Sequence, residues 1–353
     1  MNPTSRRRFL AGLSVLAVAP VLAACGSDSD STATPSSDGS SDGGASEEAA
    51  FPATITHKFG ETTVEAAPKR VVCVGLTEQD ALMALGIVPV GITYWFGDKE
   101  LQGIYPWAQE QAGDAELPTV LDSTNGIPIE EVAALAPDLI IGQYAGITDK
   151  EYELLSKIAP TVAQSGDYAD YGAPWDEMAL TIATAVGQPE KMQGIVDDVK
   201  AQVTQAAADN PGFKGQTAAV ITPYEGLFLY GPEDPRSRML LDLGFELPTL
   251  ITEAEDSEFG VSVSSERTAD LDDIGVAVWL DLQTDKAVQG IFEGTTAYDE
   301  GRWVDIGEKD GSYYVAHSFV TPLSIPYLLE RYVPQLAAAA DGDPKTEPPV
   351  VED

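Results

Sequence analysis

Few side chains in this sequence have the types and spacing of a catalytic or metal-binding site. The chain contains two histidines, His57 and His317, which lie far apart in the sequence. A bare zinc or manganese ion needs roughly three or four converging His, Cys or carboxylate ligands. The sequence contains neither a G-x-S-x-G turn for a nucleophilic serine nor a glycine-rich phosphate loop. We therefore expect no catalytic residue, no metal site and no enzymatic activity.

The first 25 residues indicate a different chemistry, which is export followed by lipid attachment. Residues 5–10 read S-R-R-R-F-L, the pattern of a twin-arginine export signal. The apolar run from Phe9 to Ala24 is shorter than the ~20 residues that a permanent membrane-spanning helix needs. It ends in L-A-A-C, typical of the bacterial lipoprotein cleavage site. The sequence predicts removal of residues 1–24 and lipidation of Cys25, which would anchor the exported protein to the outer face of the cytoplasmic membrane.

Composition restricts the partners of the exported chain. The formal net charge is −37, and it becomes about −40 without residues 1–24, which hold three arginines and no acids. Such a charge argues against nucleic acid and anionic lipid as partners and suits a soluble monomer. Residues 25–50 are rich in Ser, Asp and Gly and cannot bury an apolar core, so we expect a disordered tether. Cys73 stands in an apolar stretch, where we expect a small buried side chain and no disulfide.

Strands that alternate with short helices after residue 50 predict a parallel sheet with helices on its faces. A hairpin is expected over residues 55–65. Helices are expected from 78 to 85, with Thr77 as N-cap and Gly86 as terminator, and from 130 to 136. Further strands are expected at 71–75, 87–92 and 138–142.

The same order of elements returns in the second half of the chain. A strand is expected at 217–222, an extended segment at 227–230, a helix at 237–243 and a strand at 276–280. The segment 243–248 is similar to 85–89, and Glu266 precedes its strand as Glu130 precedes the strand at 138–142. This weak repeat of a whole lobe predicts two α/β lobes.

A long helix is expected between the two repeats, over residues 189–209. Pro189 begins it, Pro211-Gly212 ends it, and at about 1.5 Å per residue it spans ~30 Å. Apolar residues recur along it at steps of three and four, forming one stripe: Met192, Ile195, Val196, Val199, Val203 and Ala206. Two interpretations are open, a bridge between two lobes or an ordinary surface helix within one domain.

These patterns divide the chain into successive parts. We expect a signal peptide, a tether, an N-terminal lobe, an interlobe helical region that contains helix 189–209, a C-terminal lobe and a disordered tail. Their bounds are 1–24, 25–50, 51–175, 176–211, 212–340 and 341–353.

Several stretches resemble, in order and spacing, the iron-siderophore solute-binding lipoproteins of ATP-binding-cassette (ABC) importers. The resemblance covers about residues 54–340 and is carried by 55–60, 68–72, 82–91, 137–141, 154–162 and 321–326. It implies two Rossmann-like α/β lobes joined by a single long helix, the periplasmic-binding-protein clamp of the siderophore- and cobalamin-binding type. It also implies capture of a ferric siderophore between the lobes and delivery to an ABC permease and its ATPase. Iron would enter only within the ligand, so no cofactor is implied. Haem or cobalamin is the alternative ligand class, with His317 as a candidate axial ligand of haem.

The resemblance also implies that one glutamate in each lobe docks onto arginines of the permease. The matching positions are Glu130 and Glu266, although Glu131 beside Glu130 blurs the first assignment. Two separated carboxylates would set both orientation and register against a two-fold partner. The alternative is that both are solvated acids at helix starts, where they favour the helix dipole.

A bulky chelate needs aromatic walls and a few cations or hydrogen-bond donors, and the loops after the strands would line the cleft. The candidates in these loops are Trp95, Tyr144, Tyr224, Tyr230, Arg236 and Arg238. For the two arginines, the alternative is pairing with Glu233 or Asp234 at a helix start. The other four tryptophans are assigned to packing. Trp279 is expected in the core of its lobe, and the remaining three are Trp107, Trp175 and Trp303.

Overall fold

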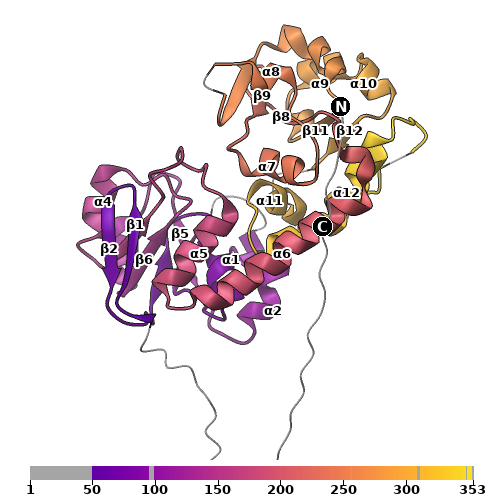
Figure 1. The fold of residues 1–353 in the computed structure, drawn as a ribbon. Helices are drawn as coiled ribbons and strands as arrows, with labels where there is room; N and C mark the ends of the chain where they lie inside the picture. Colours follow the sequence, from indigo (N-terminus) through magenta and orange to yellow (C-terminus); the bar gives the residue numbers. More distant parts are fainter. Residues whose placement is uncertain (1–49, 95–98, 256, 308–310, 347, 352–353) are drawn as a thin grey trace, which may run out of the picture. The chain divides into compact units, whose positions relative to one another are not determined.

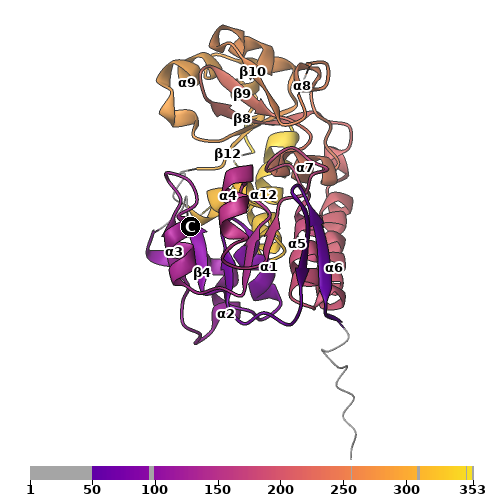
Figure 2. The same cartoon turned by 90° about the vertical axis from the view of Figure 1, so that its left-hand side faces the viewer.

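The computed structural model describes residues 50–351 except 95–98, 256, 308–310 and 347. The signal peptide, Cys25, the tether up to residue 49 and Trp95 lie outside the described residues. The described residues belong to one compact unit. It contains two α/β lobes, each built on a five-stranded sheet, and Figures 1 and 2 show them in two views.

The N-terminal lobe carries a parallel sheet, as the alternating pattern predicts. Its strand order is β5-β4-β3-β6-β7, and every neighbouring pair is parallel. The strands are β3 (Val71–Cys73), β4 (Gly91–Tyr94), β5 (Thr119–Asp122), β6 (Leu139–Gly142) and β7 (Thr161–Ala163). The helices are α1 (Glu78–Ala84), η2 (Lys99–Leu101), η3 (Pro106–Ala108), α2 (Gln109–Ala112), α3 (Ile129–Ala134), α4 (Asp149–Leu155) and α5 (Trp175–Ala185).

The predicted hairpin precedes this sheet. β1 (Ala53–His57) pairs antiparallel with β2 (Gly60–Val64), and side chains along β1 alternate between buried and exposed. Gly60 has φ +119° at the turn, a conformation that favours glycine. Figure 2 shows the hairpin beside α5, which β1 contacts.

Two local predictions in this lobe are corrected. The strand expected at 87–92 is β4, which begins only at Gly91. Pro89 has no amide hydrogen to donate to a neighbouring strand. The Ile87 amide donates to the Leu82 carbonyl at the end of α1 and so does not pair with a strand. Thr77 is the N-cap of α1, as expected, but its side chain makes no capping hydrogen bond.

The C-terminal lobe has a mixed sheet, so the repeat of the first lobe is incomplete. The strand order is β10-β9-β8-β11-β12, and β9 and β10 run antiparallel to their neighbours. The strands are β8 (Ala218–Pro223), β9 (Leu227–Tyr230), β10 (Gly260–Val263), β11 (Val276–Trp279) and β12 (Trp303–Asp305). A short loop joins β8 to β9, which forces a hairpin, whereas a parallel pair needs a long crossover.

Helices cover this second sheet, and the last of them, α12, is the final helix of the described chain. They are η4 (Pro211–Phe213), α7 (Pro235–Asp242), α8 (Thr249–Thr252), η5 (Ser265–Asp273), η6 (Leu282–Thr284), α9 (Lys286–Phe292), α10 (Thr296–Asp299), α11 (Ser312–Ser318) and α12 (Ser324–Ala340). Trp279 on β11 is fully buried, as the sequence predicts.

Helix α6 (Pro189–Asp209) has the predicted bounds and joins the two lobes. Met192 and Val196, in its first half, belong to the core of the N-terminal lobe. Val199 and Val203, in its second half, belong to the core of the C-terminal lobe. Figure 1 shows α6 running from beside α5 towards α12. One amphipathic stripe therefore contributes to two cores, which decides between the two interpretations in favour of a bridge.

Cys73 on β3 is fully buried and its thiol is free, and burial raises its pKa.

The tail after residue 340 was expected to be disordered. Its described part nevertheless contacts the C-terminal lobe: Gln335 donates a hydrogen bond to the Pro349 carbonyl, and Val351 packs against the core.

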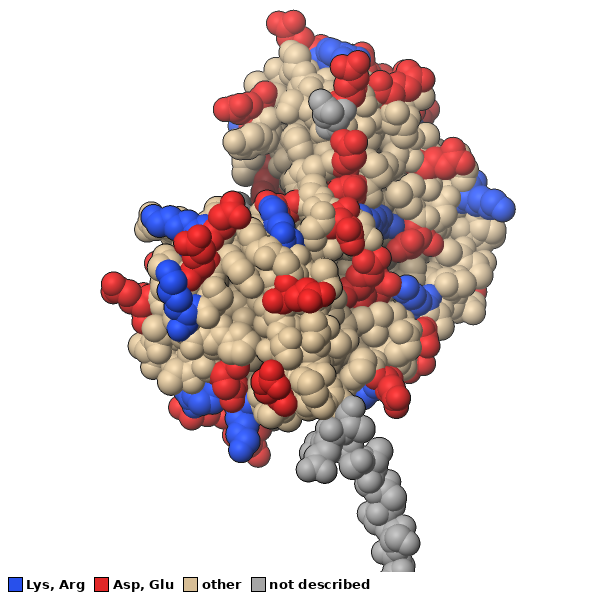
Figure 3. Space-filling model, turned by 60° about the vertical axis from the view of Figure 1, so that its left-hand side comes forward, with Lys and Arg blue, Asp and Glu red and all other residues tan. Residues whose placement is uncertain are grey.

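The surface reflects the acidic composition. On the face shown in Figure 3, acidic side chains are spread over both lobes and basic ones lie singly among them. Among the described helices, none is long and apolar enough to cross a membrane.

Candidate ligand-binding cleft

A cavity of about 570 Å³ lies between the two lobes. Tyr144 and Tyr171 line it from the N-terminal lobe. The other walls come from β8 and β9 with the loop between them, β10 with the residue before it, α7, the segment after β11, and α11 with the residue that follows it. These walls are formed by Thr222, Pro223, Tyr224, Phe228, Tyr230, Arg236, Phe259, Ser262, Asp281, Thr284, Tyr314, Ser318 and Phe319. The size and aromatic lining suit a small-molecule ligand.

The structure brings four of the six candidate residues to this cavity. Tyr144, Tyr224, Tyr230 and Arg236 line it, and Tyr224 is 64% exposed. Trp95 lies outside the described residues. Arg238 lines a separate, smaller gap. Their roles as ligand contacts remain predictions.

Arg236 is held rigidly at the cavity by a buried acid. Its Nε donates to Asp234 Oδ1 at 2.8 Å and its Nη2 to Asp234 Oδ2 at 2.6 Å, a bidentate pair. The Arg236 side chain is 11% exposed and that of Asp234 is fully buried. Burial alone would lower the pKa of Arg236, but the Asp234 carboxylate outweighs it and the net shift is upward.

The position of Arg236 follows from the start of α7. Asp234 is the N-cap, and its side chain accepts a hydrogen bond from the Arg236 amide at 2.9 Å. Pro235 occupies the first helical position, where its missing amide costs nothing. The guanidinium then lies 3.7 Å from the centre of the Tyr230 ring, a cation–π contact. The alternative foreseen for Arg236, pairing with Asp234, therefore coexists with a place at the cavity.

A buried carboxylate holds the backbone of Tyr144 in place. Glu78 Oε1 accepts a hydrogen bond from the Tyr144 amide at 2.8 Å, and Glu78 is fully buried in the first turn of α1. A Cβ atom at Gly75 would lie 2.0 Å from this carboxylate oxygen, so the contact requires glycine there. Burial raises the pKa of Glu78 and also that of the Tyr144 hydroxyl, which keeps the phenol protonated as a donor.

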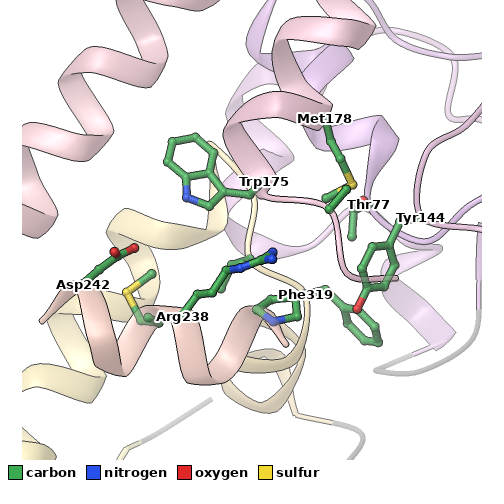
Figure 4. Close-up of a pocket in the computed structure, with 11 residues that line it drawn as sticks. Thr77, Tyr144, Trp175, Met178, Arg238, Asp242 and Phe319 are labelled. Carbon is green, nitrogen blue, oxygen red and sulfur yellow. The ribbon is translucent and has the colours of Figure 1, made fainter. Parts of the chain in front are cut away.

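Arg238 joins the lobes beside the cavity. It extends from α7 into a gap of about 10 Å³, room for about one water molecule, on the side where Tyr144 and Phe319 lie (Figure 4). There Nη1 donates to the Gly172 carbonyl of the N-terminal lobe. The guanidinium also lies 5.7 Å from the centre of the Tyr168 ring.

Sequence patterns did not predict most of the other lining residues. Phe228 had a usable signal, because side chains two apart on β9 share a face and Phe228 meets Tyr230 edge-on at 5.0 Å. Tyr314, Phe319 and Asp281 had none, since they reach the cavity from elements distant in the sequence. The Tyr314 hydroxyl donates to Asp281 Oδ2 at 3.3 Å.

A second polar contact connects the lobes away from the cavity. Asp80 on α1 is 2% exposed, and its Oδ2 accepts hydrogen bonds from Trp107 Nε1 and Thr321 Oγ1, each at 2.7 Å. Thr321 precedes α12, and Trp107 stacks obliquely on Tyr327 of that helix, with ring centres 5.1 Å apart. Burial raises the pKa of Asp80 to about 6.

Neither histidine is placed for metal chemistry. His317 is 1% exposed, lies edge-on to Tyr332 and does not line the cavity; burial and the Arg236 charge lower its pKa. His57 bonds Thr62 within the first hairpin at 2.9 Å. In the part of the chain that the structure describes, no three His, Cys, Asp or Glu side chains cluster as a metal site.

The two predicted docking glutamates are exposed, on separate lobes. Glu130 lies in the first turn of α3, before β6, and Glu131 next to it is also exposed. Glu266 lies in the first turn of η5, before β11. The predicted helix before β11 is thus a 3₁₀ helix. These positions leave both carboxylates accessible, and their docking role stays a prediction.

Two α/β lobes, a bridging helix and a ligand-sized cavity with aromatic walls define a two-lobe binding protein. The chain belongs to the periplasmic binding protein family, whose model matches residues 71–306.

Individual relatives agree with this membership. The chain is 30% identical to the Fe(3+) dicitrate-binding periplasmic protein FecB of Escherichia coli (strain K12) over 217 residues, which are 60% of this chain and 68% of FecB. It is 27% identical to the probable siderophore-binding lipoprotein YfiY of Bacillus subtilis (strain 168) over 66% of this chain and 70% of YfiY. It superposes on the crystal structure of Streptococcus pneumoniae TIGR4 PiaA in complex with ferrichrome with a TM-score of 0.71 and 26% identity, over 82% of this chain and 99% of PiaA.

Proposed function

We propose that this protein is the extracytoplasmic solute-binding lipoprotein of an ABC importer and that it captures a ferric siderophore in the cleft between its lobes. The observation that carries the proposal is the cavity itself, which offers aromatic walls and hydrogen-bond donors. A siderophore already fills the coordination sphere of its iron, so its receptor needs walls and donors rather than metal ligands.

The relatives support this ligand class. FecB is named for ferric dicitrate, YfiY for a siderophore, and PiaA was crystallised with ferrichrome. All three names describe iron held in a chelate. The names also support an extracytoplasmic location, periplasmic for FecB and lipoprotein for YfiY, which agrees with the export and lipidation motifs of residues 5–25.

The protein acts by binding without chemistry, as a monomer and without a cofactor. The lobes hold the chelate, α6 limits their relative motion because it is part of both cores, and Glu130 and Glu266 dock the loaded protein on the permease. The permease then passes the ligand onward at the expense of ATP hydrolysis in a partner chain.

Haem is the weaker alternative ligand. Its iron would need an axial side chain, and His317 is buried behind the wall against Tyr332 rather than in the lining. No described lining residue is a histidine, cysteine or methionine. Tyr144 and Tyr230 line the cavity, but burial raises the pKa of both hydroxyls, which disfavours the tyrosinate form.

Ligand titration tests the proposal directly. The chain from residue 25, with Cys25→Ser to prevent lipidation, is titrated with ferric siderophores, their iron-free forms, haemin and cobalamin while tryptophan fluorescence is followed. Saturable quenching by a ferric siderophore, much weaker without iron, is expected. Binding of haemin or cobalamin alone, or no binding at all, would contradict the proposal.

A charge reversal separates docking from capture. Glu266→Lys is expected to leave siderophore affinity unchanged, because the side chain is exposed and outside the cavity lining, and to stop uptake by cells. Glu110→Lys, at an exposed position on α2, is the matched control and should transport normally. Equal loss of binding and uptake in Glu266→Lys would remove the docking assignment.

A further inference from the structure

The charges on the walls of the cavity carry information about the class of ferric chelate that fits, an inference that rests on the proposed function. Among the described residues that line the cavity, Arg236 is the one cation and Asp281 the one acid. The rest of this described lining is aromatic, hydroxyl-bearing or proline. The net charge that a ligand meets in the cavity therefore depends on whether an acid pairs with the Arg236 guanidinium.

Arg236 is already neutralised before any ligand arrives. Both oxygens of the fully buried Asp234 accept its Nε and Nη2 hydrogens. Such a pair has no net charge, and removing either partner would leave a costly buried ion. The guanidinium has five N–H groups, and Asp234 accepts hydrogen bonds from only two of them. Arg236 thus offers a donor to the cavity without an excess positive charge.

Arg238 does not supply the missing charge. Its Nη1 is bound to the Gly172 carbonyl in the small gap beside the cavity, and it is absent from the described lining. The only charged side chain of that lining besides Arg236 is Asp281, which is negative. The whole chain, at −37, adds a field that disfavours the approach of anions.

Ferric chelates differ in net charge according to their ligating groups. Three hydroxamates, each carrying one negative charge, balance Fe³⁺ and give a neutral complex, or a cationic one where the chain bears an amine. Three catecholates carry two negative charges each and leave a strongly anionic complex, and ferric citrate complexes are anionic as well. An anion enclosed by aromatic walls without a compensating cation loses its hydration and gains little in return.

We propose that the cleft selects ferric chelates without net negative charge, the tris-hydroxamate class, because its one described lining cation is neutralised by Asp234. The remaining N–H groups of Arg236 and the hydroxyls of Tyr144, Tyr224 and Tyr230 donate hydrogen bonds to the hydroxamate oxygens. The faces of Tyr230, Phe228 and Phe259 pack against the apolar parts of the chelate. In the described lining, selection thus depends on the pairing of Arg236 with Asp234, which leaves hydrogen-bond donors without an excess positive charge.

The experiment compares chelates of different charge on the chain from residue 25 with Cys25→Ser. Dissociation constants are measured by fluorescence quenching for ferrichrome, ferrioxamine B, ferric dicitrate and ferric enterobactin. We expect the two hydroxamates to bind about 100-fold more tightly than the two anionic chelates. A second variant, Thr284→Lys, adds a cation at an exposed position of the lining. It should raise affinity for the anionic chelates about tenfold relative to the affinity for ferrichrome.

The matched control is Ala201→Lys, which adds the same charge at an exposed position of α6 outside the lining and should change none of the four constants. Tighter binding of an anionic chelate than of both hydroxamates, or equal binding of all four, would overturn the charge selection while leaving the proposed function intact. Failure of Thr284→Lys to shift the preference would also overturn it. Absence of binding by every ferric chelate would refute the proposed function and the selection with it.

Discussion

Asp80 provides a quantitative test of the contact between the lobes. Its carboxylate is buried and accepts two hydrogen bonds through Oδ2, from Trp107 and Thr321, whereas Oδ1 has no hydrogen-bond partner among the described residues. Burial raises its pKa from the usual 3.8 to about 6, although both hydrogen bonds act in the opposite direction. The perturbation we consider is Asp80→Asn, which keeps one acceptor oxygen for both donors and removes the charge.

The magnitude follows from the difference between the folded and unfolded pKa values. As pH rises through about 4, the unfolded chain loses the Asp80 proton while the folded chain keeps it up to about pH 6. The free energy of unfolding therefore falls across this window and stays constant above it. A gap of about two pKa units corresponds to about 3 kcal/mol. The ionised Asp80 thus costs about 3 kcal/mol of stability at neutral pH, and below pH 4 this cost is absent.

We expect Asp80→Asn to be more stable than the native chain by up to about 3 kcal/mol at pH 7 and nearly equal to it at pH 4. The measurement is urea unfolding of both chains at several pH values between 4 and 8. The difference between the two chains cancels most effects of the many other acids. Asp114→Asn, at an exposed position, is the control and should show no such trend.

Two results would refute this reasoning. A stability difference independent of pH would show that Asp80 does not titrate in the stated window. An Asn variant less stable than the native chain at pH 7 would show that the Trp107 and Thr321 donors stabilise the carboxylate by more than burial costs. The second result would make the ionised form a favourable part of the interlobe contact.

Three other predictions concern the cavity and the cores. Phe228→Ala should weaken binding of a ferric siderophore about tenfold, because it removes one aromatic wall, and unchanged affinity in a fluorescence titration would place the ligand elsewhere. Arg236→Ala should lower the free energy of unfolding by about 3 kcal/mol, since Asp234 would remain buried without its partner; adding Asp234→Asn should restore part of this loss in urea unfolding, and no recovery would contradict the pairing argument. Cys73 should not react with a thiol reagent at pH 8 in the folded chain and should react in denaturant, because burial raises its pKa and blocks access; rapid labelling of the folded chain would contradict its place in the core.

Elements with strong local periodicity could be predicted from the sequence alone. Helix α6 has the predicted bounds because its apolar stripe and its flanking prolines are local signals. Strand β9 was also located residue by residue, and the first hairpin was placed to within a few residues. Short sequence stretches in their order and spacing were enough to recognise the family, and the weak repeat of elements indicated two lobes. These features depend on neighbours in the sequence, which the sequence displays directly.

The partners of individual side chains were decided only by the tertiary structure. Glu78 and Asp80 read as ordinary acids in the first turn of a helix, yet both are buried, because their hydrogen-bond donors come from Tyr144, Trp107 and Thr321 in distant parts of the chain. Arg236 lines the cavity, but its neutralisation by Asp234 depends on how deeply the start of α7 is buried. The sequence indicated that aromatic residues and an arginine follow the strands, whereas burial and long-range contacts set the charge of the cavity and the walls contributed by α11. Periodicity is a local property, but desolvation depends on everything packed around a group.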